Sequence, residues 1–124
     1  MIQVGTVLQI TDNTGGRYAQ CVKVLQKTKG KVASSGDLMV VSVKALVRKH
    51  RGKIKKGHLY KTLVCETKKV LRRKDGSGIR CARNTAVLCS PTFSPLGSRI
   101  AGITPYELRL KGHTKVLSLS AANI

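Results

Sequence analysis

Hydrophobic and polar residues alternate in short runs along most of this chain. Ile2, Val4, Leu8 and Ile10 have mostly polar neighbours, a pattern typical of a half-buried strand. Four later apolar runs predict strands at residues 21–25, 38–47, 59–67 and 85–89. The run at 38–47 predicts one continuous buried face, formed by Met39, Val41, Val43, Ala45 and Val47.

Turn-forming or strongly charged segments separate these runs. They are DNTGG at 12–16, a basic loop at 27–35, RKHRGKIKKG at 48–57 and DGSG at 75–78, the last typical of a hairpin. A flat sheet of five short strands would leave two edges able to template aggregation, and closure removes both. The pattern therefore predicts a small, closed, five-stranded antiparallel β-barrel.

Helical signals occur late in the chain. Thr104, Pro105 and Glu107 fit the N-cap, N1 and N3 positions of a capping box, and Gly112 fits the residue that follows a helix. We expect a helix at residues 105–111 and a second helical turn at 115–119. The predicted fold is mainly β and forms a single domain, with a barrel core at about 1–90 and a C-terminal region of loops and one or two short helices at about 91–124.

The charge of the chain points to its partner. Lys and Arg number 24 against 5 Asp and Glu, which gives a net charge of +19, and residues 44–83 hold 15 basic residues against two acidic ones. Like charges at this density repel one another and select a polyanion, so we expect a nucleic acid. With one Phe, three Tyr and no Trp, recognition of phosphates and shape is favoured over platforms of stacked bases.

Two basic segments are the strongest candidates for contact with nucleic acid. In residues 67–88, basic residues occur on both sides of the 75–78 turn. A hairpin here would therefore project cations from both of its arms, as a narrow prong among crowded phosphates. A solvated hairpin and a flexible surface loop without function are the alternatives. The candidate residues are Arg17, Lys44, Arg48, Lys49, Lys53, Lys55, Lys56, Lys68, Lys69, Arg72, Arg73, Lys74, Arg80 and Arg83.

Signals for catalysis, metals, cofactors or membranes are weak. Cys21, Cys65, Cys81 and Cys89 lack the CxxC spacing of zinc and redox sites, so we expect four small hydrophobes on strands, in a reducing compartment. A nuclease or hydrolase would need a base, an acid and a pocket, yet the acidic residues lie far apart in sequence. No apolar run approaches the length of a membrane span. Two further alternatives are a free-standing barrel that acts as an RNA chaperone and a secreted heparin-binding factor with two disulfides.

Several motifs in one order carry a specific resemblance. They are MIQVGTVLQITDNTGGR at the start, GDLMVVSVK at 36–44, KIKKG at 53–57, the block from ETKKV through RRKDGSGIR to NTAVL, and PLGSRIAG followed by ELR. Over essentially the whole chain, these segments resemble the universal large-ribosomal-subunit protein fourteen in its bacterial and organellar form.

The resemblance implies a non-enzymatic five-stranded barrel bound to large-subunit rRNA. It also implies a place on the subunit interface, where the protein touches small-subunit rRNA and forms part of an intersubunit bridge. Large-subunit proteins numbered three and nineteen would be neighbours. Ser98, Arg99 and Lys115 match positions at which a ribosome-silencing factor docks and blocks subunit joining.

Two segments depart from the pattern of bacterial relatives. Cys81-Ala82-Arg83 stands where those relatives usually have Phe-Asp-Asp, and Ala101-Gly102-Ile103 stands where they have Phe-Gly-Pro. The first change exchanges acidic residues for a cation, and together the two remove two bulky aromatics. This drift favours an organellar, mitochondrial member over a bacterial or plastid one.

Overall fold

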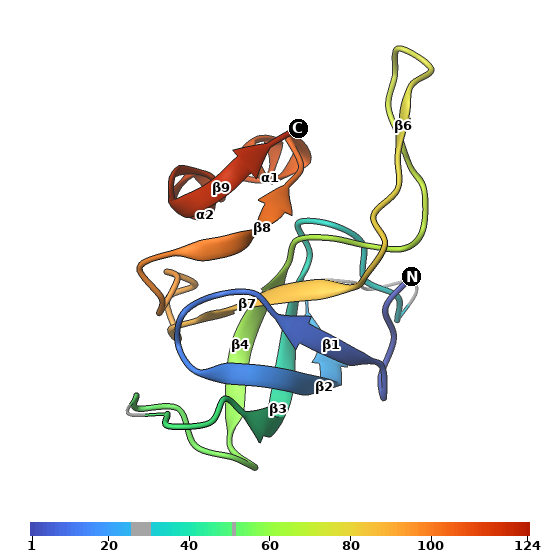
Figure 1. The fold of residues 1–124 in the computed structure, drawn as a ribbon. Helices are drawn as coiled ribbons and strands as arrows, with labels where there is room; N and C mark the ends of the chain where they lie inside the picture. Colours follow the sequence, from blue (N-terminus) through green and yellow to red (C-terminus); the bar gives the residue numbers. More distant parts are fainter. Residues whose placement is uncertain (26–30, 51) are drawn as a thin grey trace.

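The computed structural model describes residues 1–25, 31–50 and 52–124, and its central feature is a closed barrel (Figure 1). The barrel confirms the predicted fold class. Neighbouring strands around it are β1 (Val7–Ile10), β2 (Gly16–Val24), β3 (Leu38–Leu46), β4 (Leu59–Val64) and β7 (Thr85–Cys89).

The barrel is antiparallel except at its closing seam. There, β1 pairs with β7 in parallel, through Gln9 opposite Thr85 and Ile10 opposite Ala86. Strand directions cannot alternate around a ring with an odd number of strands, so one pair must run parallel. Closure of a five-stranded barrel therefore imposes an exception to the fully antiparallel sheet that we predicted.

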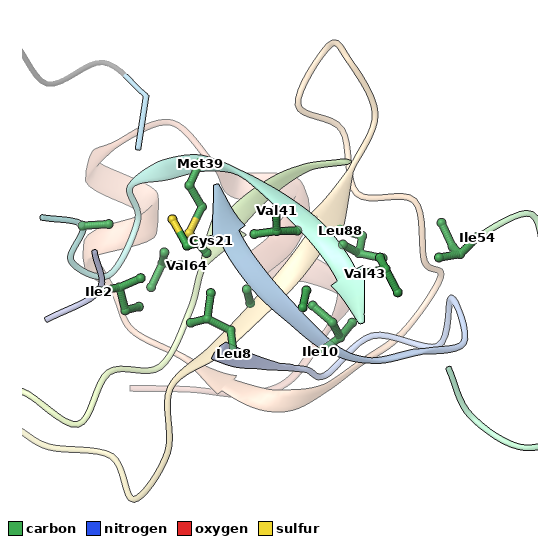
Figure 2. Close-up of a cluster of buried hydrophobic side chains, with 13 residues drawn as sticks. Ile2, Leu8, Ile10, Cys21, Met39, Val41, Val43, Ile54, Val64 and Leu88 are labelled. Carbon is green, nitrogen blue, oxygen red and sulfur yellow. The ribbon is translucent and has the colours of Figure 1, made fainter. Parts of the chain in front are cut away.

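Aliphatic side chains fill the barrel interior (Figure 2). The predicted inward face of β3 is confirmed for Met39, Val41 and Val43, each fully buried. It does not continue to Ala45, which is half-buried beside the register shift with β2, or to Val47, which is 52% exposed after the strand ends at Leu46. Leu8 and Leu88 meet this face from β1 and β7.

Strand β7 is buried on both faces along its whole length, and β4 is buried on both faces from Thr62 to Val64. On β7, Ala86 and Leu88 belong to the interior cluster, whereas Val87 and Cys89 belong to a second apolar cluster outside the barrel wall. Ile100, Leu108, Val116 and Leu117 cover that outer side, and all four come from the C-terminal region. A strand with two buried faces is an unbroken apolar run, which explains why TAVLC does not alternate.

The observed strands differ from the predicted ones mainly at their ends. β1 begins at Val7, and β4 ends at Val64. β2 begins at Gly16, five residues before the predicted start. Register shifts interrupt the β2–β3 pairing beside Arg17 and Tyr18, and both side chains are exposed. The alternation of buried and exposed residues is therefore lost at the start of β2, and the prediction depended on that alternation.

The C-terminal region contains two strands that the pattern did not predict. β8 (Ile100–Thr104) and β9 (Ser120–Asn123) pair in parallel, with α1 (Glu107–Leu110) and α2 (Thr114–Leu119) between them in the chain. The predicted capping box is wrong, since the Thr104 hydroxyl donates to the side chain of Asn123 instead of capping α1. Gly112 does follow α1, with a positive φ and an N–H that donates to Arg109.

Candidate nucleic-acid interface

The predicted prong forms as a narrow hairpin that extends away from the barrel (Figure 1). Its arms are β5 (Leu71–Arg72) and β6 (Gly78–Ile79). Asp75 organises the tip, because its Oδ1 accepts hydrogen bonds from the backbone N–H and the hydroxyl of Ser77, at 2.9 and 2.6 Å. These bonds lower the pKa of Asp75 and keep its carboxylate turned toward the turn.

Most cations of the hairpin are available to a partner. Lys68, Lys69, Arg72, Lys74 and Arg80 are exposed, and their side chains contact no carboxylate in the described part of the chain. Lys69 and Arg72 line one hollow of about 530 Å³ at the base of the prong. The hairpin therefore presents unpaired positive charge along both arms.

Arg73 has a different role from its neighbours. Its Nε donates to Glu107 Oε1 at 2.8 Å, and its terminal nitrogen donates to Glu107 Oε2 at 3.3 Å and to the Ile124 carbonyl at 2.8 Å. The hydrogen bond from Arg73 lowers the pKa of Glu107. This bidentate ion pair connects the base of the hairpin to the C-terminal region.

Arg83 is also paired within the chain. Its Nε lies 3.1 Å from Oε2 of Glu66, whose side chain is only 5% exposed. Glu66 Oε1 accepts the Ile103 N–H at 2.8 Å. A Cβ on Gly102 would come within 2.7 Å of the same oxygen. Residues 81–83 and 101–103 thus meet at one buried carboxylate.

The second basic loop, residues 48–57, is anchored by groups that the charge pattern did not single out. Ile54 inserts into the barrel end with 5% exposure (Figure 2). The Gly52 N–H donates to Nδ1 of His50, whose Nε2 bonds the Ile54 carbonyl at 2.9 Å. Ile54 is the one apolar residue in RKHRGKIKKG, and this isolated apolar position is the feature of the sequence that could have predicted the anchor. The cations of this loop that the structure describes are Arg48, Lys49, Lys53, Lys55 and Lys56, and all of them are exposed.

The two basic projections lie at opposite ends of β4 (Figure 1). The loop connects β3 to the start of β4, and the hairpin follows the end of β4. Arg17 and Arg48 both line a hollow of about 470 Å³. This hollow lies at the end of the barrel that carries residues 48–57, which we call the loop end. Lys44 is exposed near the end of β3. The predicted cations therefore form two separate surfaces.

The three residues matched to a silencing factor lie on the C-terminal side. The backbone N–H groups of Ser98 and Arg99 both donate to Asn13 Oδ1, and the Ser98 hydroxyl accepts from Asn13 Nδ2 at 2.8 Å. Lys115 is exposed in α2 and borders a hollow with the 92–95 segment. Ser98 and Arg99 are thus fixed by the 12–16 turn, and Lys115 belongs to a different element.

Groups suited to catalysis or metal binding do not gather in the described residues. All four cysteines are free thiols, and burial raises the pKa of the Cys89 thiol to about 12. Cys21 and Cys89 lie on strands as predicted, but Cys65 and Cys81 follow the ends of β4 and β6, so the prediction is wrong for these two. Across residues 1–25, 31–50 and 52–124, no three His, Cys, Asp or Glu residues are placed to hold a metal ion. Within the same ranges, no helix is long and apolar enough to cross a membrane.

Comparison with known families shows which family the chain belongs to. The family described as Ribosomal protein L14p/L23e matches residues 1–124, the full sequence. This family is structural and non-enzymatic, and its members are constituents of the large ribosomal subunit. The chain belongs to the ribosomal protein L14p/L23e family and is a structural constituent of the large ribosomal subunit.

Proposed function

We propose that the protein binds large-subunit rRNA through two separate cationic projections mounted on a rigid barrel. One observation carries the proposal: every predicted RNA-binding residue except Arg73 is exposed, and only Arg73 and Arg83 among them are paired with a carboxylate in the described chain. The barrel positions these charges, and the charges neutralise converging phosphates. No covalent step is involved.

The opposite placement of the projections supports contact with two RNA elements at once. We also propose that the protein lies on the subunit interface, as expected of its family, and contacts small-subunit rRNA as part of a bridge. Proteins three and nineteen of the large subunit are its proposed protein neighbours. A silencing factor would dock on Ser98, Arg99 and Lys115, all exposed on the C-terminal side.

Incorporation into large subunits tests the RNA-binding role. Arg72→Glu reverses an unpaired charge on the hairpin and leaves the Arg73–Glu107 pair intact. We expect reduced co-sedimentation of the tagged variant with large subunits. Lys23→Glu is the matched control, since Lys23 is an exposed cation on β2 outside both projections. Equal incorporation of both variants would contradict the assignment of the hairpin.

Salt dependence provides a second test on isolated RNA. If about 6–10 phosphates are neutralised, affinity should fall by orders of magnitude between low and physiological salt, by analogy with duplex DNA. Binding that is insensitive to salt would contradict charge neutralisation as the mechanism.

We propose that the ribosome is mitochondrial, because residues 81–83 and 101–103 differ from the pattern expected of bacterial relatives. The RNA cross-linked to the native protein identifies the compartment directly when it is sequenced. Mitochondrial rRNA is expected, and bacterial or plastid rRNA would contradict the assignment.

A further inference from the structure

We infer that the loop end of the barrel binds the base of one unpaired RNA nucleotide, with Tyr18 as the stacking surface. The inference rests on the proposed rRNA binding and adds a different kind of contact to it. Phosphate neutralisation holds any RNA, whereas a base held out of its helix is a specific structural feature.

Tyr18 is the aromatic residue best placed for such a contact. Phe93 packs against the second apolar cluster, and the Tyr60 hydroxyl accepts the Lys55 N–H within the basic loop. Tyr106 is 48% exposed in the C-terminal region, and no cation lies over its ring in the described residues. Tyr18 is 38% exposed on the barrel wall, and the Arg17 guanidinium lies over its ring.

A bulge in β2 brings Tyr18 and its neighbour Arg17 to the surface together. Gly16 lies opposite Leu46 and Tyr18 lies opposite Ala45, so Arg17 is an extra residue on β2. Bulges of this kind redirect side chains, and here two consecutive residues are both exposed. The Arg17 guanidinium lies 5.5 Å from the centre of the Tyr18 ring. Aromatic rings and guanidinium planes are the two surfaces on which RNA bases stack.

The neighbouring hollow supplies polar groups for the rest of a nucleotide. Gln9 is the direct cross-strand neighbour of Tyr18, and it lines the hollow of about 470 Å³ together with Arg17 and Arg48. An amide can both donate to and accept from a base edge or a 2′-hydroxyl, and the arginines suit phosphate. Asp12 also borders the hollow, but its two oxygens already accept hydrogen bonds from Thr14 and from the Leu88 N–H.

Arg48 is held in place by the loop that carries it. Lys49 has a φ of 58°, a conformation that a non-glycine residue rarely adopts. The hydrogen bonds of His50 and the buried side chain of Ile54 follow immediately and fix this backbone. Arg48 also borders a second hollow of about 350 Å³, which it lines together with the 12–15 turn and His50. The loop end thus offers a preorganised cationic rim beside an exposed ring.

Three RNA hairpins that differ at one position test the inference. The first has a single unpaired nucleotide in its stem, the second has an abasic nucleotide at that position, and the third is fully paired. Stacking of one base corresponds to a preference of about 5- to 150-fold for the unpaired base over its abasic counterpart. Tyr18→Phe should retain this preference. Tyr18→Leu should lose it without changing the salt dependence, because no charge is removed.

Arg48→Gln separates the two kinds of contact. This variant should bind all three hairpins more weakly, and its plot of log K against log salt should be shallower by about 0.7–0.9. Thermal unfolding of each variant checks that the barrel is intact. Salt-dependent binding with equal affinity for the unpaired and abasic hairpins, or a preference that survives in Tyr18→Leu, would overturn the inference and leave the proposed function standing. Absence of salt-dependent binding to every hairpin would overturn both.

Discussion

The barrel and the C-terminal region are stabilised by different means. Inside the barrel, a cluster of aliphatic side chains contains no charged group, and backbone ladders close the sheet. The C-terminal region also packs an apolar layer on the barrel wall, but its contacts to the rest of the chain include Arg73–Glu107 and Lys111–Asp37, both at 2.8 Å. Glu66 adds the hydrogen bond to Ile103.

This difference shows how a chain of net charge +19 uses its few carboxylates. Glu107, Asp37 and Glu66 each fasten one segment to another, and Asp12 and Asp75 shape turns. The acidic residues are therefore structural, whereas most exposed cations of the two projections keep no internal partner in the described residues. Stability of the C-terminal region should depend on pH and salt, and stability of the barrel interior should not.

The largest effect is expected from the barrel interior. Leu88→Ala removes a fully buried side chain and leaves a cavity, so the free energy of unfolding should fall by about 2–5 kcal/mol. Leu59→Ala is the matched control, because Leu59 is 61% exposed and its truncation should change stability by less than about 0.5 kcal/mol. Chemical denaturation measures both. Equal losses would show that the interior cluster is not the main source of stability.

The next effect is expected where the C-terminal region approaches Glu66. Gly102→Ala places a methyl group 2.7 Å from Glu66 Oε1, so the backbone or the carboxylate must move. Overpacking of this kind costs about 1–3 kcal/mol. Ala101→Ser changes the exposed neighbouring residue and should be nearly neutral. Unfolding by denaturant compares the two, and equal stability would contradict close packing at this carboxylate.

Removal of the cation that faces Glu66 should have a somewhat smaller effect. Arg83→Ala leaves a buried carboxylate oxygen without its partner, and because Arg83 is 45% exposed, water replaces part of the interaction. We expect a loss of about 1–2 kcal/mol in the free energy of unfolding. Arg80→Ala, which removes an exposed and unpaired arginine, should leave stability unchanged. The double variant of Arg83→Ala and Gly102→Ala should deviate from additivity by about 0.5 kcal/mol or more, since both changes act on one carboxylate.

The smallest effect is a pH dependence that originates in the C-terminal region. Arg73 holds the pKa of Glu107 below its ordinary value of 4.5, so this pair stabilises the fold above that pH. The contribution is lost as the pH falls through the lowered pKa. Burial raises the pKa of Asp12, so the contribution of this carboxyl to stability is lost as the pH rises, opposite to the contribution of Glu107. Thermal unfolding of Glu107→Gln should therefore depend less steeply on acid pH than that of the unaltered protein, and parallel curves would contradict this assignment.

The barrel strands were predictable because their pattern is local. Met39, Val41 and Val43 alternate with less buried residues, and the predicted run at 85–89 matches β7 residue for residue. The glycine after α1 was likewise predictable, since a residue with positive φ at a helix end favours glycine. The two basic projections were visible as charge runs between strands. In each case the information lies within a few neighbouring residues.

The remaining features depend on residues that are distant in the chain. β8 and β9 pair across intervening helices, and Thr104 bonds to Asn123 because that pairing brings them together, which overrides the local capping signal. In the same way, Arg73 and Arg83 look like their neighbours in sequence, yet each lies beside a carboxylate from another segment. Periodicity and local charge report whether a residue is suited to a strand or to a surface. Which partner it meets follows only from how the folded segments pack, because burial makes an unpaired carboxylate costly and draws the nearest cation to it.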